Sequence, residues 1–275
     1  MKTAFIGAGS MAEAVITGAI SSGALAADQI HVINKCNKER LEELKSRYGI
    51  HTSYDTAEIL KDSHIVVLAT KPKDAKDAIQ KVKKHLSPSA LIISLMAGVT
   101  IDFIAHETSA SHAIIRAMPN TSATIGKSAT AIALNEHVTE EQKMTALALF
   151  SSIGLTKIVK EEQLDAVTGL SGSGPAYIYY VAEAMEQAAE EIGLEKEVAK
   201  PLIIQTLLGA AEMLSATDGE AEQLRKAVMS PGGTTEAGIH ILENKEVKQA
   251  FVRCITEATA QSKRLGLPYK NPIQQ

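Results

Sequence analysis

The chain has 275 residues, enough at about 150 residues per domain for two domains with substantial cores. Hydrophobic residues make up 45% and charged residues 22% of the chain, and 28 basic against 32 acidic side chains give a net charge of −4. This composition is typical of a globular protein; it lacks the basic surface that nucleic acids require, and no apolar run reaches the ~20 residues of a membrane span.

The first half of the chain alternates short apolar runs with amphipathic stretches. The expected strands are Thr3–Ile6, Ile30–Ile33, Ile65–Ala69, Leu91–Ser94, His112–Ala117 and Ala129–Ala133. Helical patterns at Met11–Ser22, Lys38–Tyr48 and Lys73–His85 lie between most of these strands. Strand–helix alternation at this spacing predicts βαβ units in a mostly parallel sheet.

A glycine-rich turn follows the first strand and opens a helix. Its sequence, Ile6-Gly7-Ala8-Gly9-Ser10-Met11-Ala12, has the pattern G-x-G-x-x-A. Such a turn lets the backbone approach a pyrophosphate, which the N-terminus of the next helix then binds. The position of the turn at the start of a βαβ unit favours a Rossmann-type dinucleotide site over a merely tight turn.

The end of the second strand distinguishes between the two nicotinamide dinucleotides. NAD sites place an acidic residue there for the ribose 2′-hydroxyl, whereas this chain has Asn34 and Lys35. Asn34 can donate to a 2′-phosphate, and Lys35 with Lys38 adds positive charge, so we expect NADPH, with NADH as the alternative. The competing interpretation is that Lys35 and Lys38 are ordinary solvated residues at a helix start.

Three further turns fall at the carboxyl ends of strands, where ligands bind in doubly wound sheets. They contain Ala69-Thr70-Lys71-Pro72, Ala97-Gly98 and Asn120. Ala97 and Gly98 leave space for a flat ring, and Asn120 offers both a donor and an acceptor. Lys71 either faces the ligand or is a surface lysine at the sheet edge.

After about Lys160 only helical patterns remain. They cover Ala176–Glu191, Glu197–Ser215, Glu220–Met229, Thr235–Glu243 and Glu246–Leu265. We therefore predict an α/β chain with a dinucleotide-binding domain over residues 1–163 and an all-helical domain over residues 164–275. Residues 200–214 are apolar almost all round, which indicates an oligomer interface.

Two Ser/Gly-rich turns in the second half, Thr168–Tyr177 and Ser230–Glu236, each run into a helix. Consecutive backbone amides at a helix N-terminus attract an anion, so we expect a small carboxylate there. The alternative is that Ser171, Thr234 or Thr235 simply caps a helix. Cys36, Cys254 and the scattered histidines form no metal-binding pattern, and we expect no metal.

Taken together, these segments resemble the pyrroline-5-carboxylate reductase family over essentially the whole chain. The most specific are residues 165–177 and Ser230-Pro231-Gly232-Gly233-Thr234-Thr235. The resemblance implies NADPH-dependent reduction of the C=N bond of 1-pyrroline-5-carboxylate to L-proline, the last step of proline biosynthesis. It also implies a homodimer, with larger assemblies of dimers left open. Ser122 and Thr70 depart mildly from the family pattern.

The resemblance also assigns roles to positions of this sequence. The implied cofactor-binding residues are Ile6, Gly7, Ala8, Gly9, Ser10, Met11, Asn34, Lys35, Thr56, Ala69, Thr70, Lys71, Pro72, Ala97, Gly98 and Asn120. The implied substrate-binding residues are Ser171, Asp218, Gly232, Gly233, Thr234 and Thr235. Thr235 is the implied catalytic residue, which hydrogen-bonds the ring nitrogen of the imine.

Two other functions remain as alternatives. A β-hydroxyacid-dehydrogenase-like oxidoreductase needs a catalytic lysine after its second glycine-rich motif, and none occurs from Tyr177 to Glu195. A non-catalytic NADP(H)-binding sensor has no need of the Gly-Gly-Thr-Thr turn. Because Met1 leads directly into a strand and the two cysteines suit a reducing compartment, we expect a cytoplasmic protein.

Overall fold

The computed structural model describes residues 1–270 and divides them into two compact units. The α/β unit comprises Met1–Pro175 together with residues 256–270, and the helical unit comprises Ala176–Ile255. The α/β unit therefore extends past residue 163, where we predict the domain boundary, and also includes the last turns of the final long helix. The chain enters the helical unit once and returns from it once.

The α/β unit is built on an eight-stranded sheet in the order β3-β2-β1-β4-β5-β6-β7-β8. The strands are β1 (Thr3–Ile6), β2 (Ile30–Ile33), β3 (His51–Thr52), β4 (Ile65–Leu68), β5 (Leu91–Ser94), β6 (Ala113–Met118), β7 (Ser128–Leu134) and β8 (Gly154–Ile158). Neighbouring strands are parallel except for the antiparallel pair β6–β7, so the predicted mostly parallel sheet is confirmed. The strands β3 and β8 were not predicted.

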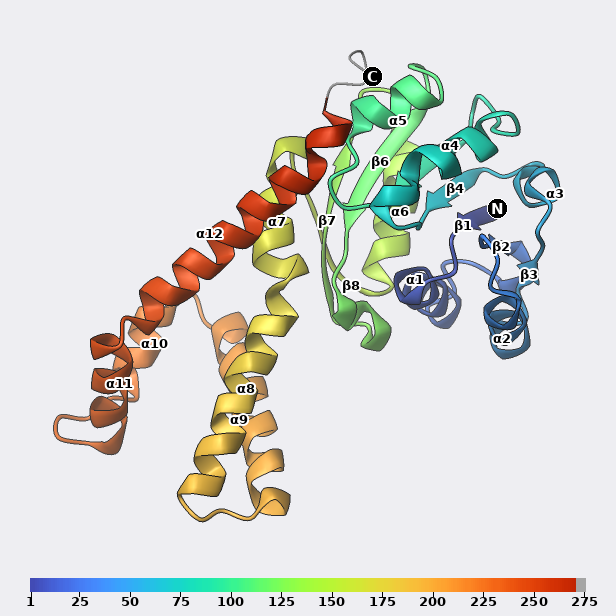
Figure 1. Cartoon of the computed structure of the whole chain (residues 1–275). Helices are drawn as coiled ribbons and strands as arrows, with labels where there is room; N and C mark the ends of the chain where they lie inside the picture. Colours follow the sequence, from blue (N-terminus) through green and yellow to red (C-terminus); the bar gives the residue numbers. More distant parts are fainter. Residues whose placement is uncertain (271–275) are drawn as a thin grey trace. The chain divides into compact units, whose positions relative to one another are not determined.

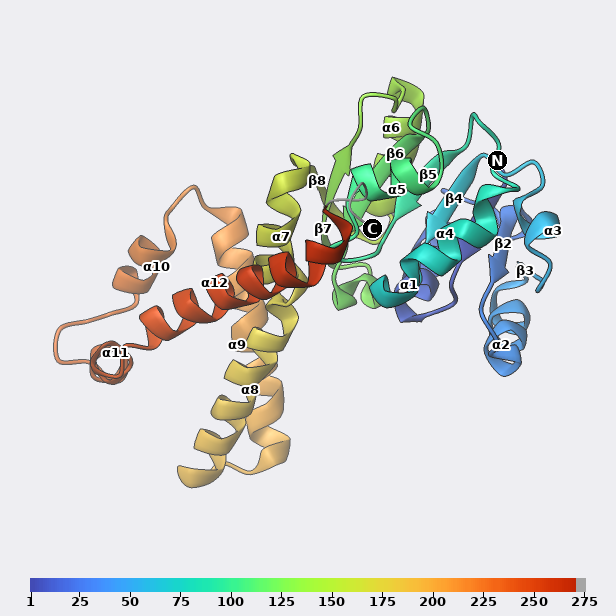
Figure 2. The ribbon, with the colours of Figure 1, turned by 45° about the horizontal axis from the view of Figure 1, so that its top comes forward.

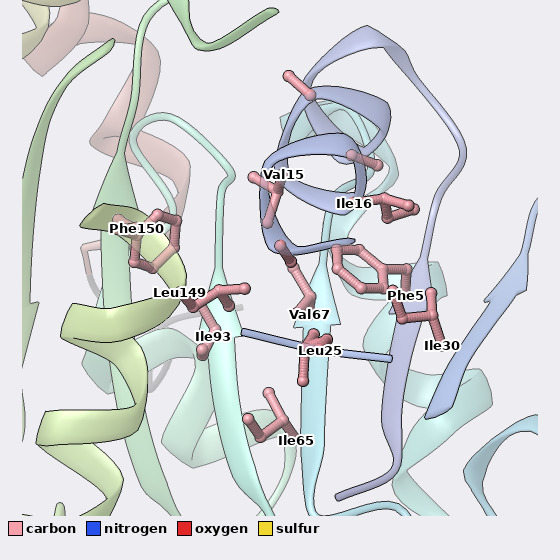
Figure 3. Close-up of a cluster of buried hydrophobic side chains, with 14 of the residues drawn as sticks. Phe5, Val15, Ile16, Leu25, Ile30, Ile65, Val67, Ile93, Leu149 and Phe150 are labelled. Atoms are coloured by element: carbon pink, nitrogen blue, oxygen red, sulfur yellow. The ribbon is translucent and has the colours of Figure 1, made fainter. Parts of the chain in front are cut away.

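Helices cover both faces of this sheet (Figure 1). One face packs against α1 (Ser10–Ser21), α2 (Lys38–Tyr48) and α6 (Glu140–Ser151), the other against α3 (Thr56–Leu60), α4 (Ala75–Lys83) and α5 (Ile101–Glu107). Successive residues of a strand point to opposite faces, so Val67 packs on the α1 side while Val66 packs on the α4 side. Figure 3 shows Phe5, Val67 and Ile93, from three neighbouring strands, in the cluster that includes Val15 and Phe150.

The helical unit contains most of α8 (Gly174–Glu191), α9 (Lys196–Ala216), α10 (Ala221–Ala227), α11 (Thr234–Asn244) and the first part of α12 (Val247–Gly266). All five were predicted. Helices α8 and α9 lie side by side in both whole-chain views (Figures 1 and 2), and Ala199 and Ile203 of α9 pack against Ala189 of α8. No helix among residues 1–270 has both the length and the apolar character needed to cross a lipid bilayer.

The segment predicted as a Ser/Gly turn, Thr168–Tyr177, is helical instead. Helix α7 (Leu164–Val167) continues into a π-helical turn, η5 (Thr168–Gly172), which bends at Ser173 and leads into α8. The hydroxyl of Thr168 donates to the carbonyl of Leu164 at 2.8 Å, and that of Ser171 to the carbonyl of Val167 at 3.2 Å. The prediction of a turn with a row of exposed amides is therefore wrong at this segment.

Candidate cofactor and substrate sites

The glycine-rich turn lies at the carboxyl end of β1, between β2 and β4, where the strand order reverses. Gly7 has φ = +117° and donates its N–H to the carbonyl of Ile33 at 2.8 Å. A Cβ on Gly7 would stand 2.5 Å from the carbonyl oxygen of Ala69, so only glycine fits between these strand ends. Ala12 is fully buried, in agreement with the predicted close packing of helix on strand.

The other end of the turn is open. Gly9 is the N-cap of α1, and no side chain caps the first amides of this helix. A Cβ on Gly9 would have no neighbouring atom within 4 Å, and both Gly9 and Ser10 are exposed. Uncapped amides, the helix dipole and free space together fit a pyrophosphate group, so these residues suit the dinucleotide that the motif predicts.

Hydrogen bonds from the Asn34 side chain fix the conformation of the loop after β2. The Asn34 side chain bonds the backbone of Asn37 twice, donating to its carbonyl at 2.7 Å and accepting from its N–H at 3.0 Å. Asn34 thus shapes the loop and keeps a second N–H for a ligand. Lys35 is 70% exposed, and its Nζ lies 3.4 Å from a carboxylate oxygen of Asp74 in η2 (Pro72–Asp74), which follows β4.

The remaining predicted cofactor residues on this edge belong to short connections. Thr56 opens α3, directly after its N-cap Asp55. Thr70 donates its hydroxyl to the sulfur of Met96 at 3.2 Å, while Lys71 is exposed. The carbonyl of Pro72 accepts a hydrogen bond of 2.7 Å from the hydroxyl of Tyr269.

A small pocket of about 190 Å³ lies beside the turn after β5. Its lining residues are Ala97, Gly98, Thr168, Ser173, Ala258, Gln261, Ser262 and Leu265. A Cβ on Gly98, whose φ is +75°, would stand 3.0 Å from Cα of Gly266. Gly98 therefore packs against the end of α12 on its Cα side, while both Ala97 and Gly98 line the pocket.

Asn120 joins this edge of the sheet to the π-helical turn. Its Nδ2 donates to the carbonyl of Ser171 at 3.0 Å, and its Oδ1 accepts from the N–H of Ser122 at 3.2 Å. Asn120 is 8% exposed, so these bonds make it a structural link as well as a candidate ligand. Two residues assigned to different ligands, Asn120 and Ser171, are thereby in direct contact.

The second predicted anion site lies wholly in the helical unit. Gly232, with φ = +72°, donates its N–H to a carboxylate oxygen of Glu236 at 2.8 Å, and Gly233 donates to the carbonyl of Ser230 at 2.9 Å. Two amides of this turn are thus already bonded within the chain. Thr234 and Thr235 open α11 and are exposed. Asp218 is exposed in the connection between α9 and α10.

A pocket of about 460 Å³ borders the same turn. Its lining residues are Met229, Gly232, Gly233, Glu236, Ala237, Ile239, His240 and Glu243. Glu236 ends the predicted turn but was given no role there, and His240 was not predicted, because a charged residue and a histidine one turn apart on a helix are ordinary surface features in a sequence. In the part of the chain that the structure describes, no group of His, Cys, Asp and Glu is arranged to hold a metal ion.

Two family models match the chain. Residues 161–265 match the model described as pyrroline-5-carboxylate reductase dimerisation, and residues 2–98 match the model described as NADP oxidoreductase coenzyme F420-dependent. Among curated proteins, pyrroline-5-carboxylate reductase 2 of Bacillus subtilis is 44% identical over 261 residues, which cover 95% of this chain and 94% of the relative.

Two solved structures are similar to this chain over nearly its whole length. A pyrroline-5-carboxylate reductase from Coxiella burnetii is 39% identical, with a TM-score of 0.88 over 96% of this chain and 98% of its own. A Plasmodium falciparum pyrroline carboxylate reductase solved with NADP bound is 28% identical, also with a TM-score of 0.88, over 97% of this chain and 98% of its own.

Proposed function

The chain belongs to the pyrroline-5-carboxylate reductase family, and we propose that it reduces 1-pyrroline-5-carboxylate to L-proline with NADPH, the last step of proline biosynthesis. The observation that carries this proposal is identity with curated reductases over nearly the whole chain, 44% over 95% of its length in one case. Both the dinucleotide turn and the second glycine-rich turn are part of the matched length.

NADPH supplies the hydride when it is bound, and the hydride adds to the carbon of the C=N bond while the ring nitrogen takes a proton. In this proposal the first amides of α1 hold the pyrophosphate. Lys35 and the second N–H of Asn34 bind the 2′-phosphate, and Ala97 borders the nicotinamide. Asp74 competes with the 2′-phosphate for the ammonium of Lys35, because one positive charge cannot fully neutralise both anions.

The turn from Gly232 to Thr235 is our proposed substrate site. The N-terminus of α11 favours the substrate carboxylate, and the Thr235 hydroxyl hydrogen-bonds the ring nitrogen. Orientation by such a hydroxyl, rather than proton transfer from a strong acid, is what this chain then contributes to the chemical step.

The match to a dimerisation model supports a homodimer formed through the helical segment, and assembly of dimers into larger oligomers is a further part of the proposal. We also propose that residues 1–163 bind the dinucleotide and that residues 164–275 bind the substrate and form the dimer.

The free, exposed thiols of Cys36 and Cys254 support a reducing compartment, the cytoplasm.

The test is oxidation of NADPH, followed by absorbance, with 1-pyrroline-5-carboxylate beside a panel of 2- and 3-oxo acids. We expect turnover with the imine alone. Thr235→Ala should lower kcat/KM by about 10- to 100-fold without changing the Kd for NADPH, because it removes an orienting contact to the substrate. Thr145→Ala, on α6 of the α/β unit, is the matched control and should match the parent.

Turnover of oxo acids instead of the imine would favour the β-hydroxyacid dehydrogenase, and NADPH binding without any turnover would favour the sensor. Parental kinetics in the Thr235→Ala variant would remove that side chain from the reaction while leaving the substrate assignment in place.

A further inference from the structure

Arg40 lies in the first turn of α2, outside every segment in which the sequence indicates ligand binding. Its side chain is 20% exposed and is shared among three acceptors. Nε donates to the carbonyl oxygen of Ala8 at 3.0 Å, Nη1 to the carboxylate of Glu43 at 2.8 Å, and Nη2 to the carboxylate of Glu13. One guanidinium group therefore connects α2, the start of α1 and the middle of the glycine-rich turn.

The bond to Ala8 fixes the direction of one peptide group. In a trans peptide the C=O and the following N–H point in opposite directions, and no peptide bond among the described residues is cis. Because the Ala8 carbonyl points to Arg40, the N–H of Gly9 points away from α2. The next peptide is fixed as well, since the Gly9 carbonyl accepts from the N–H of Glu13 at 3.0 Å.

The charge of Arg40 is balanced within the protein. Glu13 accepts further hydrogen bonds from Tyr48 at 2.8 Å and from Arg47 at 3.1 Å. Burial opposes the charge of the Glu13 carboxyl, but the hydrogen bonds and charges of Arg40, Tyr48 and Arg47 outweigh it and hold the pKa of this carboxyl below its usual value. A guanidinium paired with two carboxylates has little net charge left to attract a phosphate, so its contribution is geometric.

The same residue also connects to the loop after β2. Asn34 bonds the backbone of Asn37, and the Asn37 side chain accepts from the backbone N–H of Arg40 at 3.0 Å. The loop proposed for the 2′-phosphate and the turn proposed for the pyrophosphate thus share one anchor at the start of α2.

We propose that Arg40 is a positioning residue for the cofactor: it directs the N–H of Gly9 toward the pyrophosphate. This inference rests on the proposed function, in which the turn binds that group. Since NADPH and NADH carry the same pyrophosphate, Arg40 sets the affinity for both by the same factor, whereas Lys35 acts on NADPH alone.

The experiment compares Arg40→Met with Arg47→Met. Arg47 lies on the same helix and pairs with the same Glu13 carboxylate but does not bond the glycine-rich turn, so it is a matched control. Kd values for NADPH and NADH are measured by fluorescence titration without substrate. We expect Arg40→Met to raise both Kd values about tenfold, the usual cost of a lost charge-assisted hydrogen bond, and Arg47→Met to leave them within about twofold.

Parental Kd values in Arg40→Met would overturn the proposal. So would a loss confined to NADPH, because Arg40 would then contact the 2′-phosphate directly. If Arg40→Met fails to fold, Arg40→Lys carries the test; a single ammonium cannot reproduce the fork, and both Kd values should still rise together. A parent that binds neither dinucleotide and reduces no imine would refute the proposed function itself, whatever Arg40 does.

Discussion

The two units of this chain use apolar residues in opposite ways. In the α/β unit both faces of the sheet are covered, and large side chains such as Phe5 and Phe150 are fully buried. In the described helical unit the buried apolar residues are Ala189, Ala199 and Ile203. The α/β unit has a complete core of its own, whereas the helical unit exposes an apolar surface that a single chain does not cover.

Helix α9 displays this contrast along its own length. Ala199 and Ile203, with partly buried Leu207, pack toward α8, whereas Ile204 and Leu208 are 48% and 51% exposed. Residues four apart lie on one face of a helix, so Ile204 and Leu208 form a second apolar stripe. A helix with two apolar stripes needs two partners, and in the homodimer proposed above we expect a second copy of the chain to cover the second stripe.

Charges placed on the second stripe of α9 should have the largest effect. Ile204→Asp with Leu208→Asp should raise the Kd of the dimer by about 1,000-fold or more, because two carboxylates would be buried without partners. Light scattering at micromolar concentration should then give a monomer. Circular dichroism should keep its helical signal, because the stripe that faces α8 is unchanged.

Leu155→Asp is the control from the other unit. Leu155 is 61% exposed on the edge strand β8, so it has the same apolar exposure in a unit that already has a complete core. The dimer should survive this change. A dimer that survives the α9 substitutions as well would place the interface elsewhere.

Within the α/β unit, the two glycines of the dinucleotide turn differ in the space around their Cα atoms. Gly7→Ala forces a methyl group against the Ala69 backbone at a positive φ and should lower the free energy of unfolding by about 1–3 kcal/mol. Gly9→Ala meets open space and should leave the unfolding free energy within about 0.5 kcal/mol.

Gly9→Ala should nevertheless raise the KM for NADPH about tenfold, because the methyl group occupies the side from which the pyrophosphate approaches. Denaturant unfolding and steady-state kinetics measure the two effects separately. An unchanged KM in Gly9→Ala would show that the cofactor approaches the turn from another side.

The smallest expected effect concerns Asp74. Asp74→Asn releases Lys35 and removes a negative charge beside the proposed 2′-phosphate site, so the KM for NADPH should fall about two- to threefold while that for NADH stays constant. The effect is small because exposed ion pairs contribute at most about 1 kcal/mol. Asp77→Asn is the matched control, because it makes the same substitution nearly one turn further along, on α4. It should change neither KM. A rise in the KM for NADH alone would mean that Asp74 binds the ribose hydroxyl instead.

The features that the sequence predicts well are those with a local physical cause. The run Ile65–Leu68 is buried on both faces and therefore consists of consecutive apolar residues, which is why β4 was predicted. The two strands that were not predicted lack this signal: β3 has two residues, and β8 is half exposed at the sheet edge.

The features that it does not predict depend on contacts between distant residues. The glycines and hydroxyls of Thr168–Gly172 indicate a turn, yet bonds to the preceding helical turn and to Asn120 hold this segment in a π-helical conformation. The close packing of Gly98 against Gly266 joins two residues far apart in the chain, and no local pattern indicates it. No sequence pattern indicates the role of Arg40, because an arginine that hydrogen-bonds a turn cannot be distinguished in a sequence from one that is exposed to solvent.

The close contact of Gly98 with Gly266 has a consequence for how the chain can be divided. The polypeptide leaves the α/β unit at Pro175 and rejoins it at Thr256, and Tyr269 bonds the carbonyl of Pro72. Figures 1 and 2 both show the last turns of α12 beside α5. We therefore expect a backbone cut in the Ser230–Gly233 connection to yield two fragments that stay associated through native contacts. The shorter, C-terminal fragment would complete the fold of the longer one.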